Sequence, residues 1–275
     1  HAQKIDLNSN GMSDIWELIY GTTALTYNGD ADNDGVSNGL ESLSGTNPLD
    51  LNSAPRIALI SRSETNFTVS LPCALGKQYG LQSVPGLTNG APSDWTNDMT
   101  LVVRTGTVVT LAASASQARK FFRVAIADVD TDGDGVNDWE EYRLGLDPTK
   151  AASNSQLDGS GQPMGDYAYA TSKLASQNVV AIAATDPTAS QPDSGQNPAN
   201  FGQFTVTRGG FPLNTVTVNL GLGGPGVGCA TEGVDHQALA RSVTLPVGTS
   251  SKAITLTPLA NTNLYFAYHG TRSTS

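Results

Sequence analysis

Acidic side chains at alternate positions of residues 130–141 form a pattern that could bind a divalent cation. The segment reads DTDGDGVNDWEE, with acids at its first, third, fifth, ninth and twelfth positions and glycine at its sixth. Calcium takes about six to eight oxygen ligands at about 2.3–2.6 Å, so a chain that binds it must wind tightly around the ion. Gly135 permits such a turn. The spacing predicts calcium binding, with Val136 offering its carbonyl oxygen and Glu141 a bidentate carboxylate.

The same register occurs twice more near the start of the chain. Residues 30–41 read DADNDGVSNGLE, and residues 6–17 read DLNSNGMSDIWE, where amides replace two of the carboxylates. The candidate metal ligands are Asp6, Asn8, Asn10, Met12, Asp14 and Glu17; Asp30, Asp32, Asp34, Val36, Asn38 and Glu41; and Asp130, Asp132, Asp134, Val136, Asp138 and Glu141. The alternative is an accidental spacing of ordinary loop residues. It carries most weight for the first loop, because fewer formal charges weaken the attraction for calcium.

Each loop continues into a short amphipathic segment that predicts a helix. The apolar residues of these segments are Ile15, Trp16, Leu18 and Ile19; Leu40 and Leu43; and Trp139, Tyr142 and Leu144. The second and third segments end at Gly45 and Gly145, and a proline follows each glycine three residues later. Glycine closes a helix and proline prevents its continuation. The twelfth position of each loop therefore falls in the first turn of a helix.

These repeats resemble the bacterial version of thrombospondin type 3 calcium repeats, and more loosely the loops of dockerins and EF-hands. The resemblance covers about residues 6–50 and 128–150. It implies an extracellular, secreted or surface-attached stalk or spacer that calcium makes rigid. A full EF-hand needs a helix on both sides of its loop, and no helical pattern precedes Asp30 or Asp130. A sensor-type pair of helices that opens on binding is therefore not expected.

Composition places the chain in a broad class before any single residue is considered. At 275 residues it is long enough for two or three domains, and its formal net charge is −10 with 15% charged residues. No basic stripe offers itself to phosphates, which argues against nucleic acid as a partner. No stretch of about twenty apolar residues could span a membrane. The start at His1 rather than methionine suits a mature secreted protein or a trimmed chain.

Residues 53–127 predict a small antiparallel β-sandwich, because short runs of alternating apolar residues are separated by Gly, Pro and Asn. The runs lie at 57–59, 67–71, 79–83, 101–103, 108–111 and 121–124. The order of Tyr79 to Ser83, Trp95 and Phe121 to Val124 resembles a small immunoglobulin-like module. Trp95 and Phe121 are interpreted as core aromatics rather than a platform for stacking carbohydrate.

Residues 151–177 are rich in Ser, Gly, Gln and Ala and are interpreted as a linker. Strand patterns return in residues 178–275, at 179–182, 204–207, 216–220, 242–245 and 253–256. Several sequence segments, of which the first is GQFTVTRGG at 202–210, resemble those of a Calx-beta domain over roughly 178–260. Asp193 and Asp235 are possible ligands there, but strong carboxylates do not occur together, so calcium binding in this domain is left open.

The Calx-beta resemblance implies further strands where this chain stops at Ser275. Leu264, Phe266 and Tyr268 alternate and could supply one strand. The sandwich is therefore expected to be incomplete, with unpaired backbone groups at an open edge. Either the natural chain continues or a neighbour donates a strand.

The domain prediction is thus two calcium repeats at 1–52, an immunoglobulin-like sandwich at 53–127, a third repeat at 128–150, a linker at 151–177 and a Calx-beta-like sandwich at 178–275. The fold class is mainly β, with two antiparallel sandwiches connected by loop-plus-helix repeats. Two isolated buried thiols are favoured over a disulfide for Cys73 and Cys229, which fall in different predicted domains.

Residue patterns for catalysis are weak throughout the sequence. Residues 221–226 satisfy a GxGxxG pattern, but Pro225 prevents the helix that a nucleotide site needs. His1, His236 and His269 lack paired metal spacing, and no nucleophile elbow accompanies His236. We therefore predict a protein that is not an enzyme.

The leading functional hypothesis is an extracellular structural protein stabilised by calcium, as a surface stalk or a fibre subunit assembled by β-strand addition. Its predicted partners are copies of itself or neighbouring surface proteins. One alternative is the non-catalytic N-terminal region of a larger secreted enzyme. Another is an adhesin that binds carbohydrate or protein through the sandwich loops.

Overall fold

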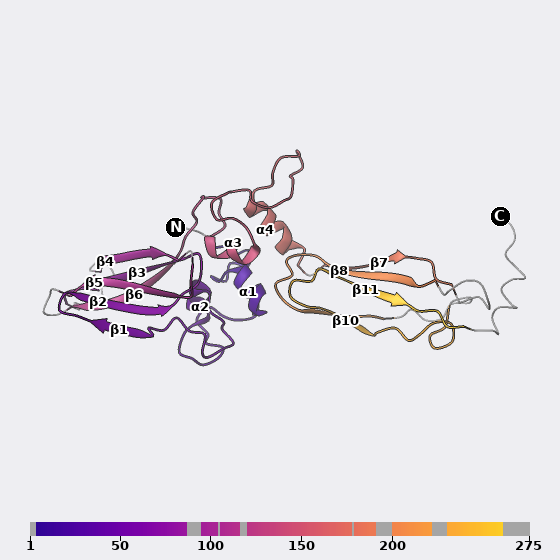
Figure 1. Ribbon diagram of the computed structural model, residues 1–275, viewed down its shortest axis with the longest axis horizontal. Helices are drawn as coiled ribbons and strands as arrows, with labels where there is room; N and C mark the ends of the chain where they lie inside the picture. The colour runs from indigo at the N-terminus through magenta and orange to yellow at the C-terminus, as the bar shows by residue number, and fades with distance from the viewer. Residues whose placement is uncertain are drawn as a thin grey trace, which may run out of the picture. The chain divides into compact units, whose positions relative to one another are not determined.

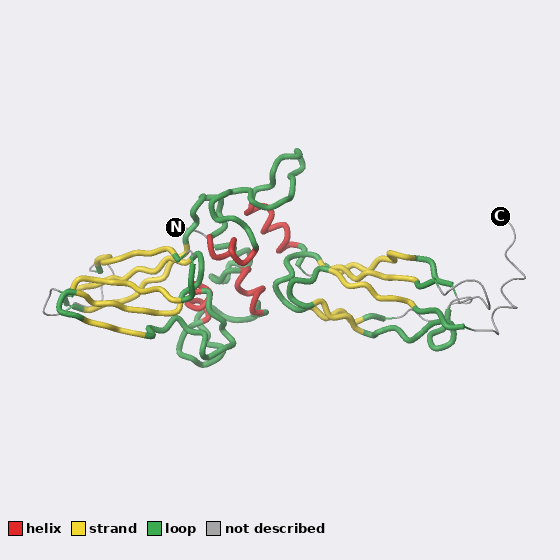
Figure 2. The backbone as a smooth tube through the Cα atoms, viewed as in Figure 1, coloured by secondary structure: helices red, strands yellow, loops and turns green. Residues whose placement is uncertain are grey.

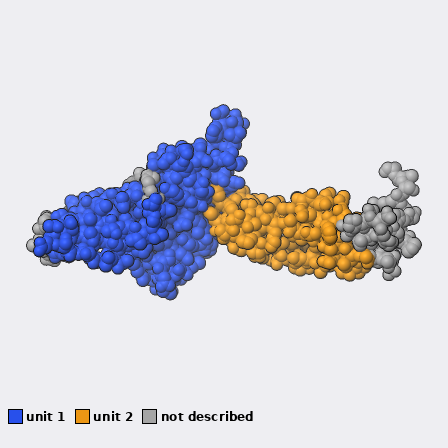
Figure 3. All heavy atoms as spheres, in the orientation of Figure 1, with its two compact units in different colours: residues 1–174 blue, residues 175–275 orange. Residues whose placement is uncertain are grey.

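The computed structural model of the protein describes residues 4–86, 95–103, 105–115, 120–177, 179–190, 200–221 and 230–260. The described residues are mainly β, with several antiparallel sheets and short helices, which confirms the predicted fold class. The chain divides into two compact units, residues 1–174 and 175–275 (Figure 3). The first unit holds all three candidate loops.

A short helix follows each loop, as the sequence predicts (Figure 1). These helices are α1 (Asp14–Tyr20), α2 (Asn38–Ser44) and α3 (Asp138–Leu144). The eighth loop residue caps each helix, since the side chains of Ser13, Ser37 and Asn137 accept a hydrogen bond from a backbone N–H of the first turn. A glycine in the left-handed conformation ends each one, at Gly21, Gly45 and Gly145. Helices of seven residues are too short to persist alone, so packing must hold them.

Six strands of the first unit form two antiparallel sheets (Figure 2). One sheet has the order β1 (Leu59–Arg62), β2 (Asn66–Pro72) and β5 (Val108–Ser114). The other has the order β4 (Thr96–Val102), β3 (Lys77–Val84) and β6 (Phe121–Asp128). All six overlap the runs whose alternation predicted strands. Burial alternates strictly along β5, as the period of two requires for a sheet with one buried face.

The core between these sheets is built from inward-facing apolar residues of both. Val69, Leu71 and Leu111 come from one sheet, and Tyr79 and Leu81 from the other, and all five are buried in one cluster. Apolar residues of the two sheets thus cover one another, which is the arrangement of a sandwich. The predicted immunoglobulin-like character of this sandwich remains a prediction.

The helices meet the sandwich at Trp139, the buried aromatic residue of α3. A Cβ on Gly45, the glycine that ends α2, would lie 2.5 Å from Nε1 of the Trp139 ring. A Cβ on Gly76, just before β3, would overlap the Trp139 backbone. Lys77 is buried beside it, with its ammonium 4.8 Å from the ring centre and paired with Asp128 of β6. Repeats that are about a hundred residues apart in the chain therefore pack on one side chain.

Part of the predicted linker is helical. Helix α4 (Asp166–Ala175) occupies the end of residues 151–177, and Asp166 and Ala170 are buried. The Asp166 carboxylate accepts hydrogen bonds from the backbone N–H groups of Ser153 and Asn154 and from both of their side chains. These tertiary partners stabilise a helix in a segment whose polar composition alone indicates flexibility.

The second unit contains a sheet of order β11 (Ser251–Leu256), β8 (Gly202–Arg208) and β7 (Val180–Asp186), and a pair formed by β10 (Ser242–Leu245) and β9 (Val216–Asn219). Its buried core is small, consisting of Val206, Val243 and Leu245 among the described residues. All five strands overlap predicted runs, while the Calx-beta assignment remains a prediction.

Several sequence-based predictions fall outside the described residues. They concern Asp193, Cys229, His1, His269, the strand predicted at Leu264, Phe266 and Tyr268, and most of the glycine-rich segment at 221–226. Cys73 carries a free thiol and packs beside the core of the first sandwich. Within the described part of the chain, no helix is both long and apolar enough to cross a membrane.

The packing at Trp139 makes a prediction about Gly76. Replacing Gly76 by Ala should lower the free energy of unfolding of the first unit by about 2–5 kcal/mol, because the new Cβ overlaps the Trp139 backbone and the residue has a φ of 76°. Gly106 is the matched control, since it has a φ of 85° but open space around its Cβ position. Its replacement by Ala should cost about 1–2 kcal/mol. Equal losses of stability for the two variants in urea unfolding would contradict the packing role.

Candidate calcium sites

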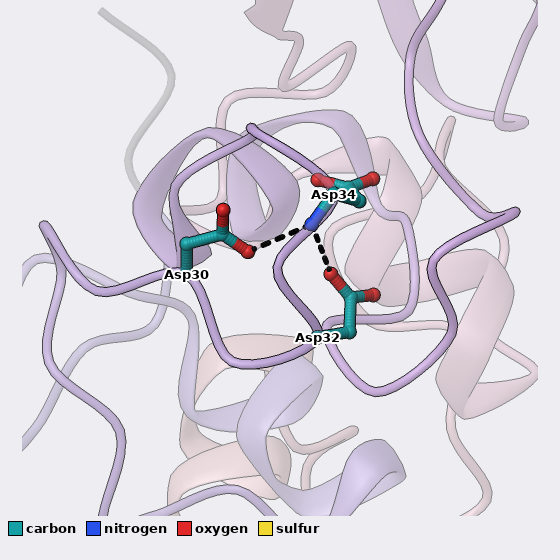
Figure 4. Close-up of side chains that lie close together, drawn as sticks. All are labelled: Asp30, Asp32 and Asp34. Atoms are coloured by element: carbon teal, nitrogen blue, oxygen red, sulfur yellow. Dashed lines mark hydrogen bonds between the residues drawn. The ribbon is translucent and has the colours of Figure 1, made fainter.

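The acidic side chains of the second loop hold its backbone in a tight turn (Figure 4). Asp30 accepts hydrogen bonds from the N–H groups of Asp34 and Gly35, at 3.2 and 2.9 Å. Asp32 Oδ1 accepts from Asp34 N at 3.1 Å, and Asp34 Oδ1 accepts from Val36 N at 2.7 Å. One carboxylate oxygen from each of the three aspartates lies within 4.8 Å of those of the other two. The loop thus brings three negative charges together.

The third loop repeats this arrangement with different residues. Asp130 Oδ2 accepts from Gly135 N at 3.1 Å, Asp132 Oδ1 from Asp134 N at 3.1 Å, and Asp134 Oδ1 from Val136 N at 2.8 Å. The three aspartates converge within the same 4.8 Å limit. In both loops the first, third and fifth positions therefore carry the convergent acids that the sequence predicts.

Two left-handed residues give each loop its turn. The fourth position is Asn33 with a φ of 62° or Gly133 with a φ of 79°, and the sixth is Gly35 or Gly135, with φ of 91° and 98°. Asparagine and glycine tolerate this region better than other residues. Residue types at these two positions therefore determine whether the alternate acids can face one centre.

The remaining oxygens of these acids are buried without a hydrogen-bond partner. In the second loop they are Asp32 Oδ2, Asp34 Oδ2 and Glu41 Oε2; in the third they are Asp132 Oδ2, Asp134 Oδ2 and both Oε atoms of Glu141. The helices deliver the two glutamates, and both are fully buried. Buried polar atoms are nearly always paired, and clustered carboxylates without a counter-charge are strongly unfavourable. These oxygens therefore fit the ligand set of a hard cation.

Burial and clustering of the acids raise the pKa values of several of their carboxyl groups. Burial, followed by repulsion from Asp32 and Asp34, raises the pKa of Glu41 to about 7. Burial, followed by repulsion from Asp132, raises the pKa of Glu141 to about 8. Burial also raises the pKa of Asp134 to about 6. A proton can neutralise these groups at low pH, whereas a divalent cation would neutralise them in their ionised form.

Charged neighbours distinguish the two loops. Arg56 donates to the backbone oxygen of Asp34, and its guanidinium lies 3.5 Å from Asp34 Oδ2 without a hydrogen bond to it. Beside the third loop, the Asp166 carboxylate adds to the repulsion on Asp134 and Glu141. A cation in the second loop therefore competes with an exposed arginine, while one in the third loop gains an extra negative neighbour. The sequence offered no signal for Asp166, which lies 25 residues beyond Glu141.

The side chain at the ninth loop position accepts hydrogen bonds from another residue of its own loop. Asp138 is not one of the three convergent acids of the third loop. Asp138 accepts hydrogen bonds from the N–H of Thr131 at 2.8 Å and from its hydroxyl at 2.7 Å. Asn38 accepts from Ala31 N at 3.3 Å. The ninth residue thus fixes the second residue of its own loop. At the seventh position, Val36 and Val136 donate their N–H groups to the aspartate at the fifth position. The binding of calcium by their carbonyl oxygens remains a prediction.

The first loop adopts the same turn. Asp6 accepts from Asn10 N at 3.1 Å and from Gly11 N at 2.9 Å, and Asp14 accepts from Leu7 N at 2.7 Å. Glu17 is buried, as its counterparts are, but its carboxylate accepts hydrogen bonds from two side-chain amides of the loop. Met12 is fully buried. The loop therefore shares the shape of the other two and differs in its polar partners.

Glu140 is an important residue that the sequence-based ligand pattern did not include. It is fully buried, accepts from Ile5 N at 3.0 Å and from the Ser13 hydroxyl at 2.5 Å, and completes a capping box with Asn137. Burial raises its pKa to about 7. The spacing of Asn137 and Glu140 could have identified the cap, but the tether to the first loop depends on tertiary structure.

Comparison with known proteins agrees with the geometry of two loops. A family model described as the bacterial TSP3 repeat matches residues 30–51 and 130–151, and residues 6–17 lie outside both segments. Searches among curated proteins and solved structures gave no match. The TSP3 repeat is a calcium-binding structural repeat, not a catalytic one, and is typical of extracellular proteins. The predicted resemblance is thereby confirmed for the second and third loops.

The raised pKa values predict that the stability of the calcium-free chain falls as pH rises, while the stabilisation added by calcium grows. Between the ordinary glutamate pKa of 4.5 and about 8, the folded calcium-free chain holds protons that the unfolded chain has lost. Its stability should therefore fall as pH rises from 5 to 8, by about 1.4 kcal/mol per pH unit for each extra proton held. The stabilisation by added calcium should instead grow over this range, because protons no longer compete.

Melting temperatures measured at pH 5, 6, 7 and 8, in chelator and in calcium, check this prediction. A rise in calcium-induced stabilisation toward low pH would contradict it.

Proposed function

We propose that this chain is a structural region of an extracellular protein in which calcium holds two loops, three short helices and a β-sandwich together. The observation that carries the proposal is the set of buried, unpartnered carboxylate oxygens in the second and third loops. The match of both loops to bacterial TSP3 repeats supports it independently.

The donor chemistry favours calcium over other divalent ions. Carboxylate oxygens are hard ligands, which suit calcium, magnesium or manganese rather than zinc or copper, and no His or Cys belongs to either convergent group. The irregular loop geometry suits calcium, because magnesium demands a near-ideal octahedron at about 2.0–2.1 Å and dehydrates reluctantly. The residues that would hold each ion are Asp30, Asp32, Asp34 and Glu41, and Asp130, Asp132, Asp134 and Glu141.

Contacts of α3 suggest how an ion could stabilise more than its own loop. Glu141 would attach α3 to the ion, and the two residues before it contact other parts of the unit. Trp139 packs on the glycines before β3 and after α2, and Glu140 binds the first loop. Calcium at the third loop would therefore fix the packing of all these elements. Its effect is on stiffness rather than on catalysis.

A direct test of this proposal is thermal unfolding with and without calcium. Each site at a hundredfold excess over its dissociation constant should add about 2.7 kcal/mol of stability. For a unit of this size that corresponds to a rise of about 5–10 °C in melting temperature. Magnesium at the same concentration should produce a much smaller rise.

Substitution of Glu141 by Gln should remove about half of the total rise produced by two sites, because one of them loses its glutamate carboxylate. Glu64 is exposed in the same unit, so Glu64→Gln is the control and should leave the rise unchanged. Equal melting temperatures in chelator and in calcium would refute the proposed function.

The second unit supports a finer proposal, that the protein assembles into a fibre by strand addition. Ile182 of β7 lies opposite the fully buried Val206, so the two side chains project from the same inner face of the sheet. Ile182 is nevertheless 57% exposed, and Val180 is 42% exposed. β7 is an edge strand of its described sheet. An added strand from another copy of this chain would cover these residues and pair the edge.

Association measured by sedimentation and electron microscopy tests this finer proposal. Ile182→Lys should abolish fibres, because it places a charge on the inner face. The control is Ala183→Lys, which adds the same charge on the opposite face of the same strand, since Ala183 pairs with Thr205. Wild-type protein that stays monomeric at high concentration in calcium would favour the alternatives, an adhesin or the non-catalytic region of a larger secreted enzyme.

A further inference from the structure

The first loop has the backbone of a calcium loop. Its fourth residue, Ser9, has a φ of 58°, and its sixth, Gly11, has a φ of 85°, close to the values of the other loops. The hydrogen bond from Asn10 N to Asp6 Oδ1 measures 3.1 Å, and its counterpart in the second loop measures 3.2 Å. The first loop therefore has the same backbone turn as the two loops with convergent aspartates.

The interior of the first loop differs from that of the others at its third and fifth positions. The Asn8 side-chain amide donates to Glu17 Oε2 at 2.9 Å, and that of Asn10 donates to Glu17 Oε1 at 2.8 Å. Both oxygens of the twelfth-position carboxylate thus have amide partners. In the third loop, by contrast, both oxygens of Glu141 are buried without any.

The orientation of both amides is determined by the backbone. Asn8 Oδ1 accepts from Asn10 N at 3.0 Å, and Asn10 Oδ1 accepts from Met12 N at 2.8 Å. A flipped amide would turn its NH₂ group toward a backbone N–H and its oxygen toward the Glu17 carboxylate, which loses two hydrogen bonds and adds repulsion. In this orientation each amide directs its NH₂ group, rather than a second oxygen, at Glu17.

The charges at the first loop also make cation binding less favourable there than in the other two loops. The first loop carries three acids against four in the second, with amides in place of the central two aspartates, and Lys4 donates a hydrogen bond to the Gly11 carbonyl. The loop also remains connected to α3 without an ion, because Ile5 and Ser13 both donate to Glu140. Both oxygens of Glu17 and the Glu140 tether therefore have partners within the protein.

We propose that Asn8 and Asn10 take the place of the cation in the first loop, so that this loop stays closed without calcium. It would then hold the N-terminal segment on α3 at all calcium concentrations. This proposal is an alternative to the sequence-based prediction of a calcium site at Asp6 to Glu17. The expected stoichiometry, two ions per chain, rests on the proposed function of the other two loops; the closed state of the first loop does not.

Hydrogen exchange in chelator tests the closed state directly. The N–H groups of Asn10, Gly11 and Met12 should exchange about tenfold more slowly, or slower still, than those of Asp34, Gly35 and Val36, after correction for intrinsic rates. Calcium should protect the second and third loops much more strongly than the first. Similar exchange of all three loops in chelator would overturn the proposal, whether or not the other loops bind calcium.

Calcium titration of a charge-restoring variant provides the second test. The double variant Asn8→Asp, Asn10→Asp replaces both donating amides by carboxylate oxygens and should bind one calcium ion more than the wild type. The control is Asn66→Asp, Asn97→Asp, which adds the same charge at exposed positions of the first sandwich and should not change the stoichiometry.

The outcomes separate the two proposals. Two ions for the wild type and three for the double variant would support both. Three for the wild type would overturn the amide proposal and leave the proposed function intact. No binding by the wild type would refute the proposed function, and the exchange experiment would still decide the state of the first loop.

Discussion

Repulsion between buried carboxylates is the constraint on which the first unit depends. The second and third loops each bring three aspartates together, and a buried glutamate carried by a short helix repels them. Such a cluster persists only if something neutralises it, because charges lose their hydration on burial and repel one another more strongly in a low dielectric. A proton, a cation or an internal hydrogen-bond donor could do so, and the three loops differ in which of these their residues allow.

Helix α3 connects this local electrostatics to the packing of the whole unit. Three consecutive residues have separate tasks. Trp139 packs against two glycines, Glu140 binds the first loop, and Glu141 is repelled by the acids of the third. A seven-residue helix has little stability of its own. Its position is therefore sensitive to whatever holds Glu141, which is why a local ion could influence distant contacts.

Two amides distinguish the first loop from its relatives within the chain. Asparagine and aspartate have the same shape, and both can accept the backbone hydrogen bonds that form the turn. They differ in the second atom, which is a donor in one and a charged acceptor in the other. The turn is therefore retained in all three loops, while the chemistry at its centre changes.

Much of this protein follows from its sequence alone. The strand runs, the three loops and the helices after them depend on local rules: alternation along a sheet, glycine where φ is positive, and a capping residue before each helix. These rules act over a few residues, so spacing is enough to apply them. The same locality explains why α4 escaped prediction, since the partners that hold Asp166 lie in a polar stretch with no helical signal.

Only the tertiary structure decided how the pieces contact one another and which polar atoms have partners. The packing of Gly45 and Gly76 on Trp139, the tether from Glu140 to Ile5, and the neighbours Arg56 and Asp166 join residues far apart in the chain. The hydrogen-bond partners of Glu17 could not be predicted from the sequence either. A loop motif gives the residue types, but not the orientation of each side-chain amide. That orientation depends on the three-dimensional hydrogen-bond network, in which every buried donor and acceptor competes for a limited number of partners.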